Sequence, residues 1–132
     1  MKDLIHNIPP LQKKYSLCLI EDDAEIGNWL IDKLAVIENI ASFNWTKNLQ
    51  DSETHIKNEK PEVIILDLKL PDGNGIDILR MIKKEQLPVK VYVFSSNTEF
   101  KKACFRLGAS RFFDKGTDSL ELLEELKNFS LE

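Results

Sequence analysis

Several side chains that can bind metal ions or phosphate groups stand directly after apolar segments of this chain. In chain order they are Glu21, Asp22, Asp67, Ser95 and Lys115. Clustered carboxylates repel one another and favour a hard divalent cation with oxygen ligands, of which Mg²⁺ fits best. One carboxylate could also attack phosphorus, while the cation, the hydroxyl and the ammonium hold the phosphoryl oxygens. The set therefore indicates metal-assisted phosphoryl chemistry, provided that the fold brings its members together.

Five short apolar segments predict the strands that carry these side chains. The clearest covers residues 63–66, four apolar residues in a row, as expected of a strand buried on both faces. Asp67 ends this run, and Pro71, Gly73 and Gly75 then break the chain into a loop. Taken alone, Asp67 could simply mark the exit of the strand into solvent. The other predicted strands cover residues 15–20, 40–46, 89–94 and 110–114.

Segments with helical periodicity separate the predicted strands. Apolar residues recur at helical spacing over residues 26–37, and Asp23 could cap the start of that helix. Asp118 and Glu121 resemble a capping box before the last helix. The other helices are predicted over residues 48–60, from about residue 75, and over 98–107. This alternation predicts an α/β protein with a doubly wound five-stranded parallel sheet and five helices, whose strand ends share one edge.

Length and composition limit the alternatives. The chain has 132 residues, of which 42% are hydrophobic, enough for the core of one domain. The net charge of −4 argues against a nucleic-acid binder, which normally carries a basic face. No apolar run approaches the roughly 20 residues that span a bilayer, and the first residues lack the apolar centre of a signal peptide. We therefore expect a cytoplasmic protein with no nucleic-acid and no membrane partner.

Other residues that could carry chemistry have ordinary structural interpretations. Residues 1–12 show no clear period, so we expect an N-terminal extension followed by one domain over 13–132. Cys18 and Cys104 make no disulfide framework, and we expect both to be reduced and mostly buried. His55 is expected to be a solvated surface residue rather than a ligand.

The chain resembles a receiver domain of a two-component response regulator over roughly residues 13 to 130. The residues that carry the resemblance are 19–23 (Leu-Ile-Glu-Asp-Asp), 65–75 (Ile-Leu-Asp-Leu-Lys-Leu-Pro-Asp-Gly-Asn-Gly), 94–96 (Phe-Ser-Ser), 108–109 (Gly-Ala) and 112–115 (Phe-Phe-Asp-Lys). The resemblance implies a flavodoxin-like sheet in the order 2-1-3-4-5. Because no output domain follows within the sequence, we expect a stand-alone regulator in a phosphorelay, not an enzyme.

The resemblance also implies a metal site. Asp22 would bind Mg²⁺ directly, Glu21 would act through water, and Asp67 and the backbone carbonyl of Lys69 would complete the protein ligands. The helical stripe that follows selects Glu21 and Asp22 as the acidic pair and leaves Asp23 as the helix cap. Asp23 as the ligand in place of Asp22 stays an alternative.

The same resemblance implies a phosphoacceptor and a switch. Asp67 would accept a phosphoryl group from the phosphohistidine of a sensor histidine kinase or phosphotransfer protein. Ser95 would contact a phosphoryl oxygen, and Lys115 would pair with Asp67 or its phosphate. Phe112 would then turn inward and repack the face formed by the fourth helix, the fifth strand and the last helix. That face would bind a downstream protein target or a second copy in a phosphorylation-dependent homodimer.

Three features depart from the family pattern. Gly116 follows Lys115 where the family usually has Pro, so we expect a trans bond, because a cis bond without Pro costs about 3–4 kcal/mol. Phe112 has no hydroxyl, so switching there would work by packing alone. The stretch from Ser95 to Gly108 is short, so the fourth helix should be trimmed or start late.

Competing functions are a degenerate receiver, a phosphatase and a flavodoxin. A degenerate receiver would bind partners without being phosphorylated, and the complete set of polar side chains argues against it. A haloacid-dehalogenase-like phosphatase would have an Asp-x-Asp motif after the strand, but here the residue two positions after Asp67 is Lys69. A flavodoxin needs a phosphate-binding loop after the first strand, and the three acids at 21–23 would repel phosphate.

Overall fold

A five-stranded parallel sheet forms the centre of the structure, a computed structural model that describes residues 13–131. Its strand order β2-β1-β3-β6-β7 confirms the predicted order 2-1-3-4-5. The predicted extension, residues 1–12, lies outside the described residues. The strands are β1 (Tyr15–Ile20), β2 (Ile40–Thr46), β3 (Val63–Leu66), β6 (Lys90–Ser95) and β7 (Arg111–Asp114).

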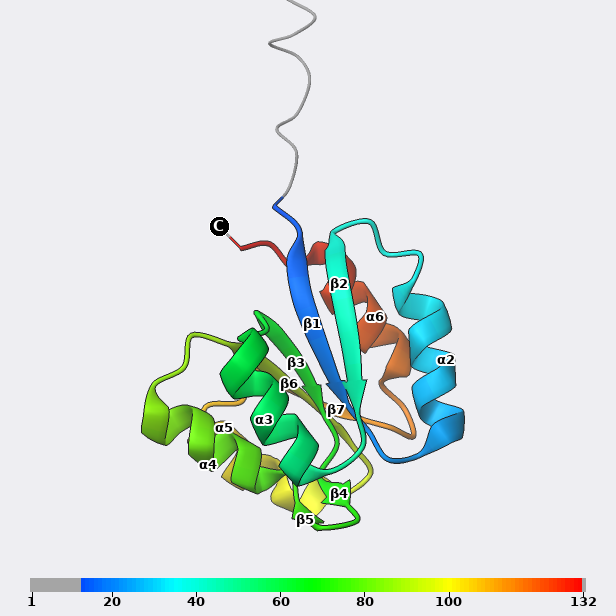
Figure 1. Cartoon of the computed structure of the whole chain (residues 1–132). Coiled ribbons are helices and arrows are strands. Elements are labelled where there is room, and N and C mark those ends of the chain that lie inside the picture. Colours follow the sequence, from blue (N-terminus) through cyan, green and yellow to red (C-terminus); the bar gives the residue numbers. More distant parts are fainter. Residues whose placement is uncertain (1–12, 132) are drawn as a thin grey trace, which may run out of the picture.

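Helices cover both faces of this sheet (Figure 1). Helices α2 and α6 lie on one face, and α3, α4 and α5 lie on the other. None of the described helices is long and apolar enough to cross a membrane. Their bounds are α2 (Ala24–Leu34), α3 (Leu49–Glu59), α4 (Ile76–Glu85), α5 (Lys101–Arg106) and α6 (Ser119–Asn128), and a 3₁₀ turn (Thr98–Phe100) precedes α5.

Alternate residues of the strands pack against the two helix layers. In β1, Leu17 and Leu19 join the apolar cluster under α2 and α6, while Cys18 and Ile20 join the cluster under α3, α4 and α5. Strand β3 is buried along its whole length, as its four apolar residues predicted. Cys18 and Cys104 are both buried, as expected, and form no disulfide with each other. Because the core fills both sides of the sheet, the strand ends are the places left for polar chemistry.

A short antiparallel pair that the sequence did not predict follows β3. Strand β4 (Lys69–Leu70) pairs with β5 (Gly73–Asn74). Between them, Asp72 accepts hydrogen bonds from the backbone N–H groups of Leu49 and Gln50, at 2.7 and 3.1 Å. These are unsatisfied donors at the start of α3, so the Asp72 carboxylate caps that helix from outside. The loop after β3 is thereby tied to the first turn of α3.

Two helix starts near the C-terminus test the expectations from sequence. Helix α5 begins only at Lys101, after the 3₁₀ turn, which confirms a late start, and Gly108 behind it has a φ of 96°. The predicted capping box at Asp118 is wrong. Its carboxylate accepts hydrogen bonds from the Asp114 N–H and the Thr117 hydroxyl, and it makes no side-chain cap for α6. Asp118 therefore stabilises the turn before α6 rather than the helix itself.

Candidate functional site

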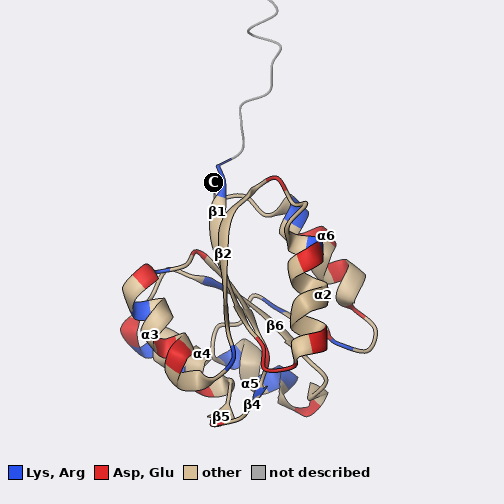
Figure 2. Cartoon of the chain, turned by 45° about the vertical axis from the view of Figure 1, so that its right-hand side comes forward, with Lys and Arg blue, Asp and Glu red and all other residues tan. Residues whose placement is uncertain are grey.

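The first strand ends in an acidic turn, residues 21–23, which Figure 2 shows as a red stretch between β1 and α2. Glu21 is buried, with 1% of its surface exposed, whereas Asp22 is exposed. Asp23 accepts hydrogen bonds from the N–H groups of Glu25 and Ile26 at 2.9 and 3.1 Å, and so caps α2 as expected. Because the Asp23 carboxylate is used in this way, Glu21 and Asp22 are left as the acids available to the strand edge.

The third strand brings Asp67 to the same edge. Its N–H donates to the Ile20 carbonyl at 2.9 Å, and the residue is 4% exposed. The N–H of Lys69 lies 3.4 Å from the Asp67 carboxylate. Gly75 packs directly on this backbone, so that a Cβ at position 75 would clash with the Asp67 carbonyl oxygen. The loop after β3 therefore closes tightly only because residue 75 is a glycine.

Lys115, which follows β7, reaches both buried acids. Its Nζ lies 2.8 Å from Glu21 Oε1 and 3.0 Å from Asp67 Oδ2, and its side chain is 15% exposed. Burial by itself lowers the pKa of Lys115, but the hydrogen bonds and charges of Glu21 and Asp67 reverse that effect and raise it. The ammonium is therefore held in its charged form. None of the described peptide bonds is cis, so the Lys115–Gly116 bond is trans as expected.

The surroundings of Glu21 disfavour the charged form of its carboxyl group. Burial, and then the neighbouring Asp67 carboxyl group, raise the pKa of Glu21 to about 7, although Lys115 opposes the shift. One ammonium thus compensates two nearly buried carboxyl groups only in part. A second source of positive charge would favour the ionised form of Glu21.

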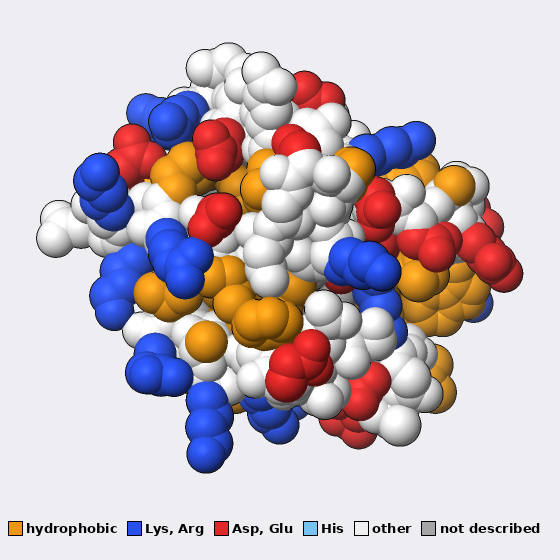
Figure 3. Space-filling model, turned by 90° about the horizontal axis from the view of Figure 1, so that it is seen from below, with side chains coloured by type: hydrophobic (Ala, Val, Ile, Leu, Met, Phe, Trp, Pro, Cys, Tyr) orange, Lys and Arg blue, Asp and Glu red, His pale blue; other side chains and the backbone are white. Residues whose placement is uncertain are grey.

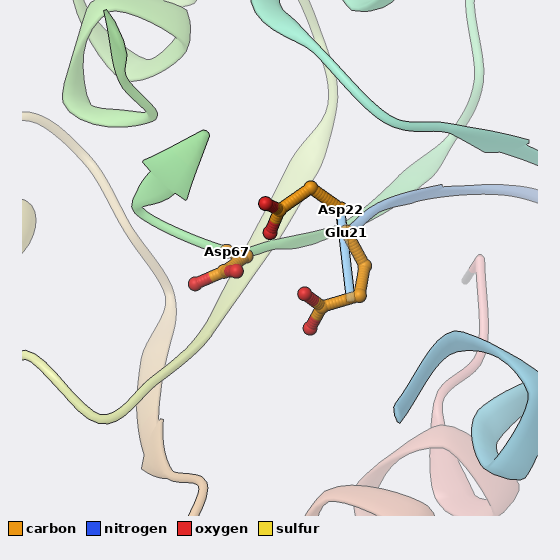
Figure 4. Close-up of side chains that lie close together, drawn as sticks. All are labelled: Glu21, Asp22 and Asp67. Atoms are coloured by element: carbon orange, nitrogen blue, oxygen red, sulfur yellow. The ribbon is translucent and has the colours of Figure 1, made fainter. Parts of the chain in front are cut away.

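Three carboxylates converge at this edge. One oxygen of each of Glu21, Asp22 and Asp67 lies within 4.8 Å of the others, the one such cluster found among residues 13–131. Figure 4 shows the three carboxylates around one common region, two from the end of β1 and one from the end of β3. A donor set made only of carboxylate oxygens suits Mg²⁺, a hard cation. The residues present therefore fit the ion that the sequence predicted.

Ser95 ends β6, the strand next to β3, and Phe112 lies on β7, the edge strand beyond β6. Ser95 is 1% exposed, and its hydroxyl accepts a hydrogen bond from the Asn97 N–H at 3.0 Å. Its carbonyl accepts a hydrogen bond from the Lys115 N–H at 3.2 Å. Phe112 is 7% exposed and packs in the cluster under α3, α4 and α5. Phe112 is therefore packed inward in this structure, and its response to phosphorylation stays a prediction.

Three residues that shape the site were not predicted to do so. Trp45 donates its indole N–H to the Glu21 carbonyl at 2.7 Å, Asp72 anchors the hairpin, and Gly75 allows the close approach to Asp67. The sequence held one signal for the position of Trp45, namely Gly27, a glycine inside a predicted helix. The Trp45 ring packs where a side chain at position 27 would lie. No local signal identifies the partner of Asp72, since Leu49 and Gln50 are distant in sequence.

Comparison with known proteins assigns the chain to a family. The response regulator receiver domain family matches residues 17–127, and the chain belongs to this family. The protein-glutamate methylesterase/protein-glutamine glutaminase of Clostridium acetobutylicum is 30% identical over 114 residues, which are 83% of this chain and 33% of that protein. The probable C4-dicarboxylate response regulator DctR of Bacillus subtilis is 31% identical over 85 residues, 64% of this chain and 38% of that protein. The chain thus spans between 33% and 38% of the length of these relatives.

Solved structures support the same assignment. The response regulator domain of Thermotoga maritima CheB superposes with a TM-score of 0.76 at 25% identity, covering 87% of this chain and 95% of that one. The receiver domain of HemR from Leptospira biflexa gives a TM-score of 0.76 at 27% identity, covering 90% and 98%. These likenesses confirm the predicted receiver fold. Receiver domains bind Mg²⁺ at an acidic pocket and interact with histidine kinases or phosphotransfer proteins.

Proposed function

We propose that this receiver domain accepts a phosphoryl group on Asp67 from a phosphohistidine of a sensor histidine kinase or phosphotransfer protein. One observation carries the proposal. The Asp67 carboxylate is nearly buried at a strand end, paired with Lys115, and within 4.8 Å of carboxylate oxygens of two further acids. A carboxylate that lies beside an ammonium and faces a cation site is suited to act as a nucleophile toward phosphorus.

In this proposal Mg²⁺ would be held by Asp22 and Asp67, by Glu21 through water, and by the backbone carbonyl of Lys69. When bound, the ion supplies positive charge to the phosphoryl oxygens as negative charge builds up during transfer. Lys115 supplies a second positive charge, 3.0 Å from the Asp67 carboxylate. The capping of α2 by Asp23 supports Asp22 rather than Asp23 as the direct ligand.

The transfer is an in-line displacement. An oxygen of the Asp67 carboxylate forms a bond to phosphorus, and the bond between phosphorus and the imidazole nitrogen of the donor breaks. The electron pair of that bond stays on the imidazole nitrogen, and because the other ring nitrogen of the phosphohistidine carries a proton, the donor leaves as neutral imidazole. The phosphoryl group becomes an acyl phosphate beside Lys115, whose ammonium already lies 3.0 Å from Asp67.

The output begins at Ser95. Phosphorylation adds about −1.5 to −2 charge to the site, and the Ser95 hydroxyl turns toward it, giving up the bond from the Asn97 N–H. Asn97 precedes the 3₁₀ turn and α5, so its release allows that segment to move while Phe112 stays packed beneath it. This shift between two packings exposes a changed surface to a downstream protein target.

The contact surface in this proposal is the face of α5, β7 and α6. Phe105 of α5 is 44% exposed, and Lys101, Lys102 and Arg106 on the same short helix are exposed as well. Figure 3, which views the end of the molecule that holds the site, shows basic side chains gathered beside apolar ones. An exposed aromatic side chain with cations around it is a common anchor in protein interfaces.

Transfer from phosphoramidate, which carries a phosphorus–nitrogen bond like that of phosphohistidine, tests this function. The protein is incubated with phosphoramidate and Mg²⁺, and ³¹P spectra are recorded for the wild type and Asp67→Asn. An acyl phosphate signal that needs both Mg²⁺ and Asp67 is expected. A folded wild-type protein that binds Mg²⁺ but forms no acyl phosphate, or that binds no Mg²⁺, would favour the degenerate receiver instead.

A further inference from the structure

The peptide group that joins the two metal-site acids is tied to the edge strand β2. The N–H of Glu21 donates to the Thr46 carbonyl at 3.0 Å, as a continuation of the sheet. The carbonyl of Glu21 accepts a hydrogen bond from the indole N–H of Trp45 at 2.7 Å, which no regular sheet pairing supplies. Both backbone polar groups of Glu21 therefore depend on β2, although β2 itself carries none of the acids.

The Trp45 ring is held in place by the helix that follows the acidic turn. A Cβ at Gly27 would clash with three atoms of the indole, so the absence of a side chain at position 27 makes room for the ring. Glycine inside a helix costs about 1 kcal/mol relative to alanine, which indicates that the space it leaves is used. Lys47 adds a contact on the ring, with its Nζ 4.5 Å from the ring centroid.

This contact bears on the metal site because a peptide group is planar. Fixing the carbonyl oxygen of Glu21 fixes the plane that links Glu21 to Asp22. At one end of this peptide group Glu21 reaches Lys115, and at the other end Asp22 reaches the cluster with Asp67. If the plane rotated, the two acids could not both keep these positions.

We propose that Trp45 is a positioning residue for the divalent cation: its indole N–H fixes the peptide between Glu21 and Asp22 in the orientation that the ion needs. The inference rests on the proposed function, since it concerns the ion of the same site. Trp45 contacts neither the ion nor the phosphoryl group in this role. It acts through the backbone of the acidic turn.

Two single-tryptophan variants test the inference. Trp45→Phe keeps an aromatic ring against Gly27 and removes the N–H donor. Trp29→Phe is the matched control, the same substitution at a tryptophan of α2 that is 36% exposed. The dissociation constant for Mg²⁺ is measured by calorimetry, and the unfolding midpoint is measured in EDTA. Loss of one hydrogen bond predicts about a three- to tenfold weaker Mg²⁺ affinity in Trp45→Phe, and an unchanged affinity in Trp29→Phe.

A kinetic readout separates positioning from general destabilisation. In Trp45→Phe, the Mg²⁺ concentration for half-maximal phosphorylation by acetyl phosphate should rise about three- to tenfold, while the rate at saturating Mg²⁺ stays within about twofold of wild type. A purely structural role would lower the unfolding midpoint in EDTA and leave the half-saturating concentration unchanged, which would overturn the inference.

A second variant removes the donor without changing the shape of the ring. In the Trp29→Phe background, Trp45 is the only tryptophan and can be replaced biosynthetically by β-(benzothiophen-3-yl)alanine, which has sulfur in place of N–H. The same loss of Mg²⁺ affinity is expected, and an unchanged affinity would contradict the inference. If the wild type itself binds no Mg²⁺, the proposed function fails. If the wild type binds Mg²⁺ and the Trp45 variants bind it equally tightly, only the role of Trp45 fails.

Discussion

The ammonium of Lys115 lies 3.0 Å from the carboxylate of Asp67, and both side chains are nearly buried. The same ammonium is also paired with Glu21 at 2.8 Å. Lys115 therefore stabilises two carboxyl groups before any phosphoryl group arrives. Its first role in this site is to make the acidic cluster compatible with folding.

Replacing Lys115 by Met should destabilise the protein most in the absence of a divalent cation. The variant leaves Glu21 and Asp67 without their buried partner, and we expect it to lower the free energy of unfolding by about 2 kcal/mol in EDTA. Saturating Mg²⁺ should restore more stability to the variant than to the wild type. Urea unfolding with and without Mg²⁺ measures both effects.

The control for this prediction is Lys69→Met, which removes an exposed ammonium two residues after Asp67. Exposed charges contribute little to stability, so its unfolding free energy should stay within about 0.5 kcal/mol of wild type. Equal effects of the two substitutions would show that the Lys115 ion pair does not stabilise the site.

The apparent Mg²⁺ affinity should rise with pH across neutrality. Because the pKa of Glu21 is raised to about 7 in the ion-free site, a proton competes with the ion below that pH. One competing proton predicts about a tenfold increase in affinity between about pH 6 and 8. Calorimetric titration over this range measures it, and Glu21→Gln should flatten the dependence.

The stability of the ion-free protein should change in the opposite direction. A carboxyl group with a raised pKa binds its proton more tightly in the folded state, so its contribution to stability falls as pH rises through about 7. Unfolding in EDTA should therefore show wild type losing stability relative to Glu21→Gln between about pH 5 and 7, with little further change above that range. Parallel curves for the two proteins would contradict the raised pKa.

Gly75 should tolerate no side chain. Ala at this position would clash with the Asp67 carbonyl oxygen, and a Cβ would lie 3.1 Å from Leu68 Cα. We expect Gly75→Ala to lower the free energy of unfolding by at least about 2 kcal/mol. Phosphorylation should also be slower, because the loop after β3 must shift away from its position to make room for the added methyl group. Gly116→Ala is the control: the nearest atom to its Cβ is a side-chain oxygen of Asp114 at 3.3 Å, so little change is expected.

The strands and the acidic turn were predictable because local sequence determines them. The unbroken apolar run at residues 63–66 can only be a buried strand or a piece of buried helix, and its bounds in the structure are those predicted. The capping of α2 by Asp23 follows from one residue at a helix start. Glu21, Asp22, Asp67 and their meeting at one sheet edge follow from the parallel topology.

What the sequence did not predict depends on contacts between distant segments. The two-residue strands β4 and β5 are too short for a periodic signal, and the carboxylate of Asp72 finds its donors on α3 only after folding. Asp118 satisfied the spacing of a capping box, yet its carboxylate accepts hydrogen bonds from Asp114 and Thr117 instead.

Site-resolved mass spectrometry after incubation with acetyl phosphate tests the central claim most directly. Wild type and Asp67→Asn are incubated with and without Mg²⁺, intact masses are recorded, and the modified peptide is sequenced. The proposal predicts one added phosphoryl group, dependent on Mg²⁺, located on Asp67 and missing from Asp67→Asn. A phosphoryl group on any other residue, or equal labelling of Asp67→Asn, would contradict the assignment of Asp67 as the phosphoacceptor.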